Sequence, residues 1–246
     1  MKENKYDNNE FFEKYSSMLR SKEGLSGAGE WPALKQMLPE FNGKNVLDLG
    51  CGYGWHCVYA KMNGAISVTG IDISEKMLSK AKEKSTGMDI EYIRTPIEDY
   101  SYPQSKFDIV ISSLAFHYIE NLQDIFSKVN RTLKPDGNFV FSCEHPVFTS
   151  EGSQQWYADK SGKILHFPVD NYFCEGRCDA LFLGEHVVKY HRTLTTYIKL
   201  LLKNGFEIQD FTEPSPTAEM LDKYAEMKDE LRRPMMMIIS AKKKTN

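Results

Sequence analysis

A glycine-rich turn between an expected strand and an expected helix carries the residues best suited to bind a ligand. Its sequence is Val46-Leu-Asp-Leu-Gly-Cys-Gly-Tyr-Gly54, in which an acid, Asp48, precedes three glycines at alternate positions, Gly50, Gly52 and Gly54. Glycine lets the backbone turn sharply and approach a ligand closely, because it has no side chain. The helix that follows would expose its first N–H groups at the same place. These residues predict a ligand site at the end of the strand.

The spacing of these glycines differs from that of a dinucleotide site. A dinucleotide-binding turn has the spacing G-x-G-x-x-G, and its helix binds a pyrophosphate. Here Trp55 stands where the third glycine would fall, which argues against NAD or FAD. Asp72 ends the next expected strand and lies 18 residues beyond Gly54, close to the spacing of roughly 20 residues at which an acid meets ribose hydroxyls. The residues predict a ligand with a ribose but no pyrophosphate.

Strands and helices alternate on either side of this turn. The expected strands are 45–49, 66–72, 90–95, 107–113, 138–143, 206–211 and 235–241. The expected helices between them are 55–63, 74–84, 122–133 and 193–204. Strands that alternate with helices form a parallel sheet with helices on both faces. The predicted fold class is therefore α/β, a doubly wound, mostly parallel sheet of seven strands.

Two segments stand outside this alternation. The first, residues 1–43, is named here the N-terminal arm, and it contains an amphipathic stretch at 8–20 and a second short helix at 30–38. The second, residues 144–190, is named the inserted segment; it is rich in aromatic residues and has no clear period. It follows the fifth strand, and loops at the carboxyl edge of such a sheet form the ligand crevice. We expect a single domain, 1–246, with the inserted segment as a substrate cap.

Composition limits the partners. The chain has 31 Lys and Arg against 34 Asp and Glu, so no overall positive field would hold a nucleic acid, although a local basic groove is compatible with these totals. The first ten residues are polar, and no apolar run is long enough to span a bilayer. Five cysteines without an export signal favour reduced thiols. We expect a cytoplasmic monomer or homodimer without membrane contact.

Cysteines and histidines in and beside the inserted segment are possible zinc ligands. Cys174 and Cys178 have His166, His186 and Cys143 nearby in sequence. The spacing is loose, and the second cysteine pair of many structural zinc sites is missing. The expected metal content is none.

The turn, Asp72 and the alternating topology resemble the class I S-adenosylmethionine-dependent methyltransferases, particularly the small-molecule branch with the pattern V-L-D-L-G-C-G-x-G. The resemblance is close over residues 44–143 and looser over the last two strands, which it places in a final antiparallel hairpin. It implies a Rossmann-like methyltransferase fold, S-adenosylmethionine as cofactor, S-adenosylhomocysteine as product, and O- or N-methylation of a small molecule. The alternatives are an RNA or protein methyltransferase and a regulatory protein that binds the cofactor without catalysis.

The resemblance also implies cofactor contacts residue by residue. The turn backbone would border the methionine part of the cofactor, Asp48 would support the turn, and Asp72 would hold the ribose hydroxyls. Pro96 replaces an acid that the family usually has at the adenine edge, which leaves Ile97 and Glu98 for that edge. The expected cofactor contacts are Tyr15, Asp48, Gly50, Cys51, Gly52, Gly54, Asp72, Ile73, Met77, Ile97, Glu98, Ser113 and Leu114.

Two histidines are candidates for proton transfer. His117 and His145 each follow a central strand at the carboxyl edge, and histidine is suited to move protons near neutral pH. Either could instead bind a loop carbonyl. Tyr190, His191 and Arg192 precede the helix after the inserted segment and are candidates for substrate contact.

Aromatic residues of the inserted segment are expected to line an apolar pocket over the methyl-bearing end of the cofactor, with His145 and His191 near its mouth. A small planar or apolar acceptor would suit such a pocket. The alternative is that these residues form the core of a small subdomain. They are Phe148, Trp156, Tyr157, Phe167, Tyr172, Phe173 and Phe182.

Overall fold

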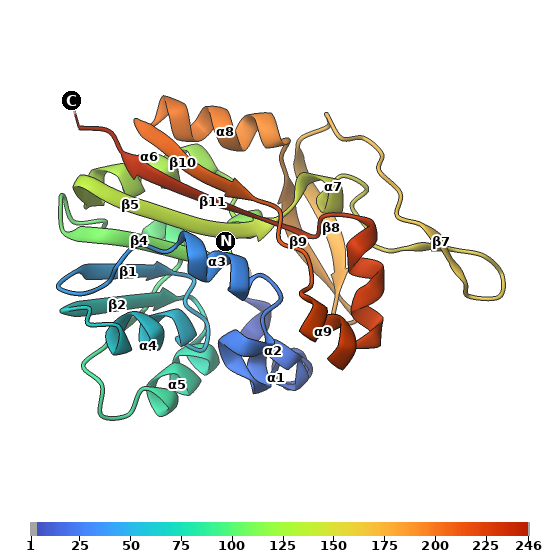
Figure 1. Ribbon diagram of the computed structural model, residues 1–246, viewed down its shortest axis with the longest axis horizontal. Coiled ribbons are helices and arrows are strands. Elements are labelled where there is room, and N and C mark those ends of the chain that lie inside the picture. Colours follow the sequence, from blue (N-terminus) through green and yellow to red (C-terminus); the bar gives the residue numbers. More distant parts are fainter. Residues whose placement is uncertain (1–3, 246) are drawn as a thin grey trace.

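A seven-stranded sheet runs through the centre of the chain (Figure 1). The computed structural model describes residues 4–245, and the strand order is β10-β11-β5-β4-β1-β2-β3. Strands β1 to β5 are parallel to one another, whereas β11 runs antiparallel to both β5 and β10. This arrangement confirms the predicted α/β sheet and its closing antiparallel pair. The strands are β1 (Asn45–Leu49), β2 (Ser67–Asp72), β3 (Glu91–Arg94), β4 (Phe107–Ser113), β5 (Leu133–Glu144), β10 (Phe206–Thr212) and β11 (Met236–Lys243).

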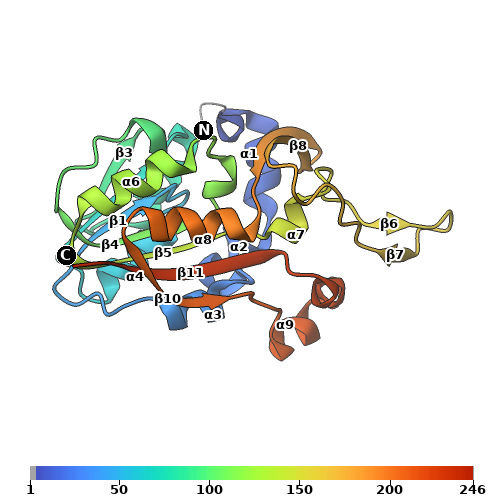
Figure 2. The same ribbon diagram turned by 90° about the horizontal axis from the view of Figure 1, so that it is seen from above.

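Helices cover both faces of the sheet (Figure 2). In β1, Leu47 and Leu49 pack on one face and Val46 on the other, since successive side chains of a strand point to opposite faces. Burial on both faces explains why the central strands read as continuous apolar runs. The helices are α3 (Trp31–Met37), α4 (Trp55–Met62) and α5 (Glu75–Lys84) on the Val46 side, and α6 (Leu122–Thr132) and α8 (Leu194–Lys203) on the Leu47 side.

Element boundaries follow capping and pairing. The Ser74 hydroxyl accepts a hydrogen bond from the Met77 N–H and fixes the start of α5, as the sequence predicts. Among the strands, the largest difference from the predicted boundaries is in β5. β5 begins at Leu133 rather than at 138, because Leu133 already pairs with Phe107 of β4 ahead of a register shift.

Residues 5–27 of the N-terminal arm lie across the carboxyl edge of the sheet (Figure 1). Its expected helix at 8–20 is interrupted at Met18, whose backbone is extended with ψ of 151°. The chain therefore changes direction at Met18, between two short helices. The arm contains η1 (Lys5–Asp7), α1 (Asn9–Ser17), α2 (Leu19–Lys22), η2 (Gly24–Gly27) and α3.

The inserted segment forms two hairpins beyond the carboxyl ends of the strands (Figure 1). One of them, β6–β7, extends away from the body of the molecule in both views (Figures 1 and 2). The alternation of β9 is hidden in the sequence, because its inward positions hold Lys189 and His191 as well as Val187. The elements are α7 (Pro146–Thr149), β6 (Tyr157–Ala158), β7 (Ile164–His166), β8 (Gly176–Phe182) and β9 (Glu185–His191).

Short helices complete the chain. They are η3 (Ile97–Asp99), η4 (Phe116–Tyr118), α9 (Ala218–Lys223) and η5 (Ala225–Arg232). Over residues 4–245, no helix combines the length and the apolar character that crossing a membrane requires.

Candidate active site

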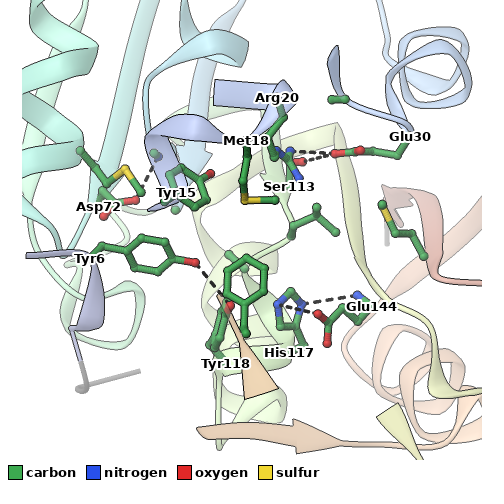
Figure 3. A pocket seen from close by; sticks show the side chains of 18 of the residues that line it. Tyr6, Tyr15, Met18, Arg20, Glu30, Asp72, Ser113, His117, Tyr118 and Glu144 are labelled. Carbon is green, nitrogen blue, oxygen red and sulfur yellow. Dashed lines mark hydrogen bonds and ion pairs between the residues drawn. The ribbon is translucent and has the colours of Figure 1, made fainter. Parts of the chain in front are cut away.

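A cavity of about 310 Å³ lies at the carboxyl edge of the sheet, beneath the N-terminal arm. Figure 3 shows Asp72 at one end of this cavity and Glu144 at the other. The strands and their following loops contribute Gly50, Gly52, Asp72, Ile73, Met77, Pro96, Ile97, Glu98, Ser113, Leu114, Ala115, His117, Tyr118, Ile119 and Glu144. The arm contributes Tyr6, Tyr15, Met18, Leu19, Arg20, Gly27, Ala28, Gly29 and Glu30, and the rest of the chain contributes Phe182, Met227, Met235 and Met236.

The glycine turn can form one wall because its backbone is left-handed at three positions. Gly50, Gly52 and Gly54 have φ of 75°, 53° and 73°, a region that other residues rarely adopt. At Gly50 an added Cβ would lie 2.8 Å from the Cβ of Ala115, so the turn and the loop after β4 can approach each other only without a side chain there. The turn is also held by the Ile71 carbonyl, which accepts from the N–H of both Gly50 and Cys51 at 2.9 Å.

Asp72 lies at the end of β2, and each of its carboxylate oxygens accepts one backbone hydrogen bond. Its Oδ2 accepts from the Gly52 N–H at 3.0 Å, and its Oδ1 accepts from the Ser74 N–H at 2.8 Å. Burial raises the pKa of Asp72 to about 6 despite these hydrogen bonds. Each oxygen keeps a further lone pair for a ligand. Asp72 therefore links the glycine turn to the start of α5 and still offers acceptors to the cavity.

Asp48 lies under the turn and does not line the cavity. Its Oδ2 accepts from the Cys57 thiol at 3.3 Å, and its Oδ1 has no hydrogen-bond partner among the described residues. Burial raises the pKa of this carboxyl to about 7. The position suits a residue that supports the turn from below.

Asp7 anchors the N-terminal arm over the cavity. Its carboxylate accepts from the Ser74 hydroxyl at 2.6 Å and from the Lys76 N–H at 3.1 Å, at the N-terminus of α5. It also pairs with Arg94 at 3.3 Å. One residue earlier, the Tyr6 side chain lines the cavity (Figure 3). The sequence prediction missed Tyr6 and Asp7, since neither belongs to the amphipathic pattern of the arm.

An ion pair between the partly buried Arg20 and the buried Glu30 borders the cavity near the glycine turn. The two side chains are 2.9 Å apart, and the Ser113 hydroxyl donates to the same Glu30 oxygen at 3.3 Å. Glu30 is only 1% exposed, and its other oxygen, Oε2, has no partner among the described residues. A buried carboxylate oxygen without a partner costs free energy, so the arrangement suits a ligand that donates a hydrogen bond here. Neither residue belongs to a periodic pattern in the sequence.

Glu144 and His117 form the polar part of the opposite end. The Glu144 N–H donates to His117 Nδ1 at 3.4 Å, and His117 Nε2 lies 3.9 Å from Glu144 Oε1. Burial lowers the pKa of His117 to about 4, so its ring is neutral near pH 7. Burial would raise the pKa of Glu144, but the neighbouring His117 and Lys189 hold that pKa below its ordinary value. At neutral pH this end therefore contains a carboxylate and an uncharged imidazole.

The expected cofactor contacts fall into three groups. Cys51 lines a smaller pocket of about 60 Å³ that adjoins the cavity and shares Tyr15, Arg20 and Gly50 with it. Asp48 and Gly54 line neither space. The remaining ones line the main cavity, and they are Tyr15, Gly50, Gly52, Asp72, Ile73, Met77, Ile97, Glu98, Ser113 and Leu114.

His145 and the residues at 190–192 lie outside the cavity lining, in contrast to their expected roles. His145 accepts from the Val147 N–H at 3.0 Å as the cap of α7, and its Nε2 lies 2.8 Å from Glu213. His191 lies between the Thr149 hydroxyl at 2.7 Å and the Tyr172 carbonyl at 2.9 Å.

The two neighbours of His191 are placed differently. Arg192 donates to the carbonyls of Ile119 and Glu120 behind η4, and Tyr190 lies on the opposite face of β9 from Lys189. In this structure the contacts of Arg192, like those of His191 and His145, join elements of the fold.

Most aromatic residues of the inserted segment also lie away from the cavity. Phe182 alone among the seven lines it. The guanidinium of Arg233 lies 4.6, 5.0 and 4.9 Å from the ring centroids of Phe148, Trp156 and Phe167. Phe173 is 88% exposed. Three of the rings pack around Arg233, which is distant in sequence, and the lining there contains Met227, Met235 and Met236 instead, named here the methionine-rich wall. Among the side chains that the structure describes, no three of His, Cys, Asp or Glu come together as metal ligands would.

Known proteins share both the sequence and the fold of this chain. A family model described as a methyltransferase domain matches residues 47–141. A Listeria monocytogenes protein assigned as an S-adenosylmethionine-dependent methyltransferase aligns with a TM-score of 0.86 and 55% identity over 90% of this chain and 100% of its own. An S-adenosylmethionine-dependent methyltransferase from Mesorhizobium loti aligns with a TM-score of 0.83 and 41% identity over 89% of this chain and 100% of its own. An uncharacterized protein of Haemophilus influenzae is 34% identical over 97% of this chain and 96% of its own.

Proposed function

The chain belongs to the class I S-adenosylmethionine-dependent methyltransferases, and from that premise we propose that it methylates a small, uncharged molecule bound beside Glu144. The lining of the cavity carries this proposal. An acid suited to ribose stands at one end, and the other end has one carboxylate among apolar side chains. Met236 pairs with Glu144 across β11 and β5, so the methionine-rich wall adjoins that carboxylate.

The residues at the glycine turn fit the cofactor. Asp72 would accept hydrogen bonds from the ribose hydroxyls through its remaining lone pairs. Glu30 Oε2, buried without a partner among the described residues, would accept from the amino group of the methionine part. Arg20 would pair with the carboxylate of that part, since a guanidinium matches carboxylate geometry. Ile73, Met77 and Ile97 would pack against the adenine.

The chain itself contributes mainly orientation. When bound, the cofactor supplies a methyl group on a sulfonium, which needs no metal and no covalent enzyme intermediate. The walls of the cavity then have to hold the acceptor atom in line with that group, and alignment of this kind contributes about 7 to 11 kcal/mol to lowering such a barrier. Methionine side chains fill irregular space and adapt to a ligand, so Met227, Met235 and Met236 suit an apolar acceptor.

The charges at this end favour an uncharged acceptor. Among the described residues that line the cavity, Arg20 is the one Lys or Arg, and Glu30 pairs with it. Lys189 pairs with Glu144 but does not line the cavity, so an anionic acceptor beside Glu144 would lack a free cation. A polyanion such as RNA would call for clustered Lys and Arg. These features favour a small neutral molecule over a nucleic acid.

Two measurements test this function. S-adenosylmethionine and S-adenosylhomocysteine should both raise the melting temperature, because a ligand that binds the native state stabilises it, and NAD should leave that temperature unchanged. Incubation of a metabolite extract with methyl-labelled cofactor should then place label in a small neutral product. A shift with NAD but not with the two methyl-cycle ligands would refute the cofactor assignment. Binding without any S-adenosylhomocysteine formed would instead indicate a non-catalytic binding protein.

A further inference from the structure

A buried lysine holds the carboxylate at the acceptor end. Lys189, only 1% exposed, donates to Glu144 Oε1 at 2.5 Å and to Gln154 Oε1 at 2.7 Å. Gln154 Nε2 in turn donates to Glu144 Oε2 at 2.6 Å. A buried ammonium is costly unless it is paired and hydrogen-bonded, as it is here. The inserted segment thus supplies both side chains that fix the Glu144 carboxylate.

The pair of Glu144 and Lys189 has no net charge. Each carboxylate oxygen accepts one hydrogen bond from the inserted segment and retains lone pairs that protein groups leave free. Because Lys189 compensates the charge, the carboxylate offers a hydrogen-bond acceptor to the cavity without strongly attracting a cation. A permanently cationic acceptor would also be repelled by the sulfonium.

His117 offers the complementary group. Its Nδ1 accepts from the Glu144 N–H, so the neutral ring carries its proton on Nε2. That N–H lies 3.9 Å from Glu144 Oε1, too far for a direct hydrogen bond. Both side chains line the cavity (Figure 3). A single oxygen atom between them could hydrogen-bond to both, since each such bond spans about 2.8 Å.

The hydrogen-bond donor of His117 and the hydrogen-bond acceptor of Glu144 together favour one kind of group on the molecule that is methylated. A hydroxyl can accept from His117, donate to Glu144 and still present a second lone pair to the methyl group. A carboxylate has no hydrogen to donate to Glu144. A neutral amine has one lone pair, and accepting from His117 would occupy the pair that must attack. The geometry therefore fits a hydroxyl best.

We propose that Glu144 and His117 form an acceptor subsite for a neutral hydroxyl group, and that Glu144 is the catalytic residue that takes its proton. This inference rests on the proposed function and specifies a hydroxyl oxygen as the atom that receives the methyl group. As the hydroxyl oxygen bonds to the methyl carbon, the electron pair of the broken carbon–sulfur bond stays on sulfur and the proton passes to Glu144. Methylation makes that proton strongly acidic, so a carboxylate with a low pKa is a sufficient base late in the transfer. Lys189 acts as a positioning residue.

Calorimetry with matched probes tests the subsite in protein saturated with S-adenosylhomocysteine. The probes are 2-naphthol, 2-methoxynaphthalene, 2-naphthylamine and 2-naphthoate, which share one ring system and differ in the group offered. The wild type should bind 2-naphthol at least about tenfold more tightly than each of the other three, the difference that one charge-assisted hydrogen bond produces. Equal or tighter binding of any of the other three, or no binding of 2-naphthol, would overturn the proposal.

Two variants and a control assign the preference to these side chains. The double variant Glu144→Gln with Lys189→Met removes both charges together, so no buried ion is left unpaired, and it should reduce the preference to within about threefold. His117→Phe keeps the ring and removes the donor, and it should have a similar effect. Glu207→Gln, the same change at an exposed position of β10, should retain the full preference. A preference that survives in both cavity variants would also overturn the proposal.

The double variant should also lower turnover of any probe that the wild type methylates, by about 100-fold or more. Its melting temperature and its affinity for S-adenosylhomocysteine report whether it is folded. If S-adenosylhomocysteine itself fails to bind the wild type, the proposed function fails. If it binds and the probe preference is absent, only the subsite is refuted.

Discussion

The hydroxyl oxygens of Tyr6 and Tyr118 lie 3.3 Å apart, one on the N-terminal arm and the other after β4. Both side chains line the cavity, so this contact joins the arm to the loop after β4 at the cavity wall. With Asp7 fixed at the start of α5, the arm is attached at both sides of the cavity. These contacts hold the arm over the cavity.

Tyr6→Phe should weaken ligand retention with little effect on folding. The change removes one hydrogen bond, worth about 1 kcal/mol, and should raise the dissociation constant of S-adenosylhomocysteine about fivefold, mainly through faster dissociation. The melting temperature should fall by no more than about 4 °C. Tyr157→Phe, at an exposed tyrosine of β6, is the control. Stopped-flow dissociation rates that match the wild type would show that the contact does not restrain the arm.

Some of this site could be predicted from sequence and some could not. Asp72 was predictable because it ends an apolar strand at a known distance from a glycine turn, and β1 and β4 follow the predicted ranges. Arg20 and Glu30 carry no such pattern, since they meet only after the arm folds back.

The inserted segment was harder to predict for a physical reason. Lys189 occupies an inward position of β9, where a charged residue hides the alternation typical of a strand. His145 follows a central strand as expected of an active-site residue, yet its contacts are with Val147 and Glu213. Distant partners such as Arg233 decide where the aromatic rings pack, and local spacing contains no information about them.

Asp72→Ala should weaken binding of both S-adenosylhomocysteine and adenosine by about 10- to 100-fold, corresponding to roughly 1.5 to 3 kcal/mol for hydrogen bonds to a charged group. Both ligands contain the ribose, so both should be affected alike. Asp89→Ala, at an exposed acid before β3, should change neither affinity. If calorimetry shows that Asp72→Ala retains the wild-type affinity for adenosine, the ribose does not bind to Asp72.

Glu30→Gln should separate the two ligands. Its carboxylate is positioned for the amino group of the methionine part, which adenosine lacks, so the S-adenosylhomocysteine affinity should fall about tenfold or more while the adenosine affinity is retained. Glu40→Gln, an exposed acid shortly after α3, serves as control. A parallel loss for both ligands would indicate that Glu30 acts only by holding Arg20 and the arm in place.

Asp48→Asn should reveal how much stability the buried acid under the glycine turn costs at neutral pH. Burial raises the pKa of Asp48 in the folded state to about 7, above its ordinary value of 3.8. The folded state therefore binds this proton more tightly than the unfolded state. The stabilisation from this group is complete below about pH 4 and is lost as the pH rises through 7. Asparagine cannot ionise. The free energy of unfolding of Asp48→Asn should therefore increase relative to that of the wild type as the pH rises from 4 through 7, by up to about 1.4 kcal/mol per pH unit.

The same experiment has an internal reference. Denaturant unfolding of both proteins at pH 4 and pH 8 gives two differences in the free energy of unfolding, and their comparison isolates the part of the change that depends on pH, to which the Cys57 thiol contact contributes. Asp89→Asn, at an exposed carboxyl, should show no change in its difference from the wild type between these pH values. The pH 8 difference for Asp48→Asn should exceed the pH 4 difference. Equal values would mean that Asp48 ionises as readily in the folded protein as in the unfolded chain, and its unpartnered Oδ1 would then have to be satisfied by water.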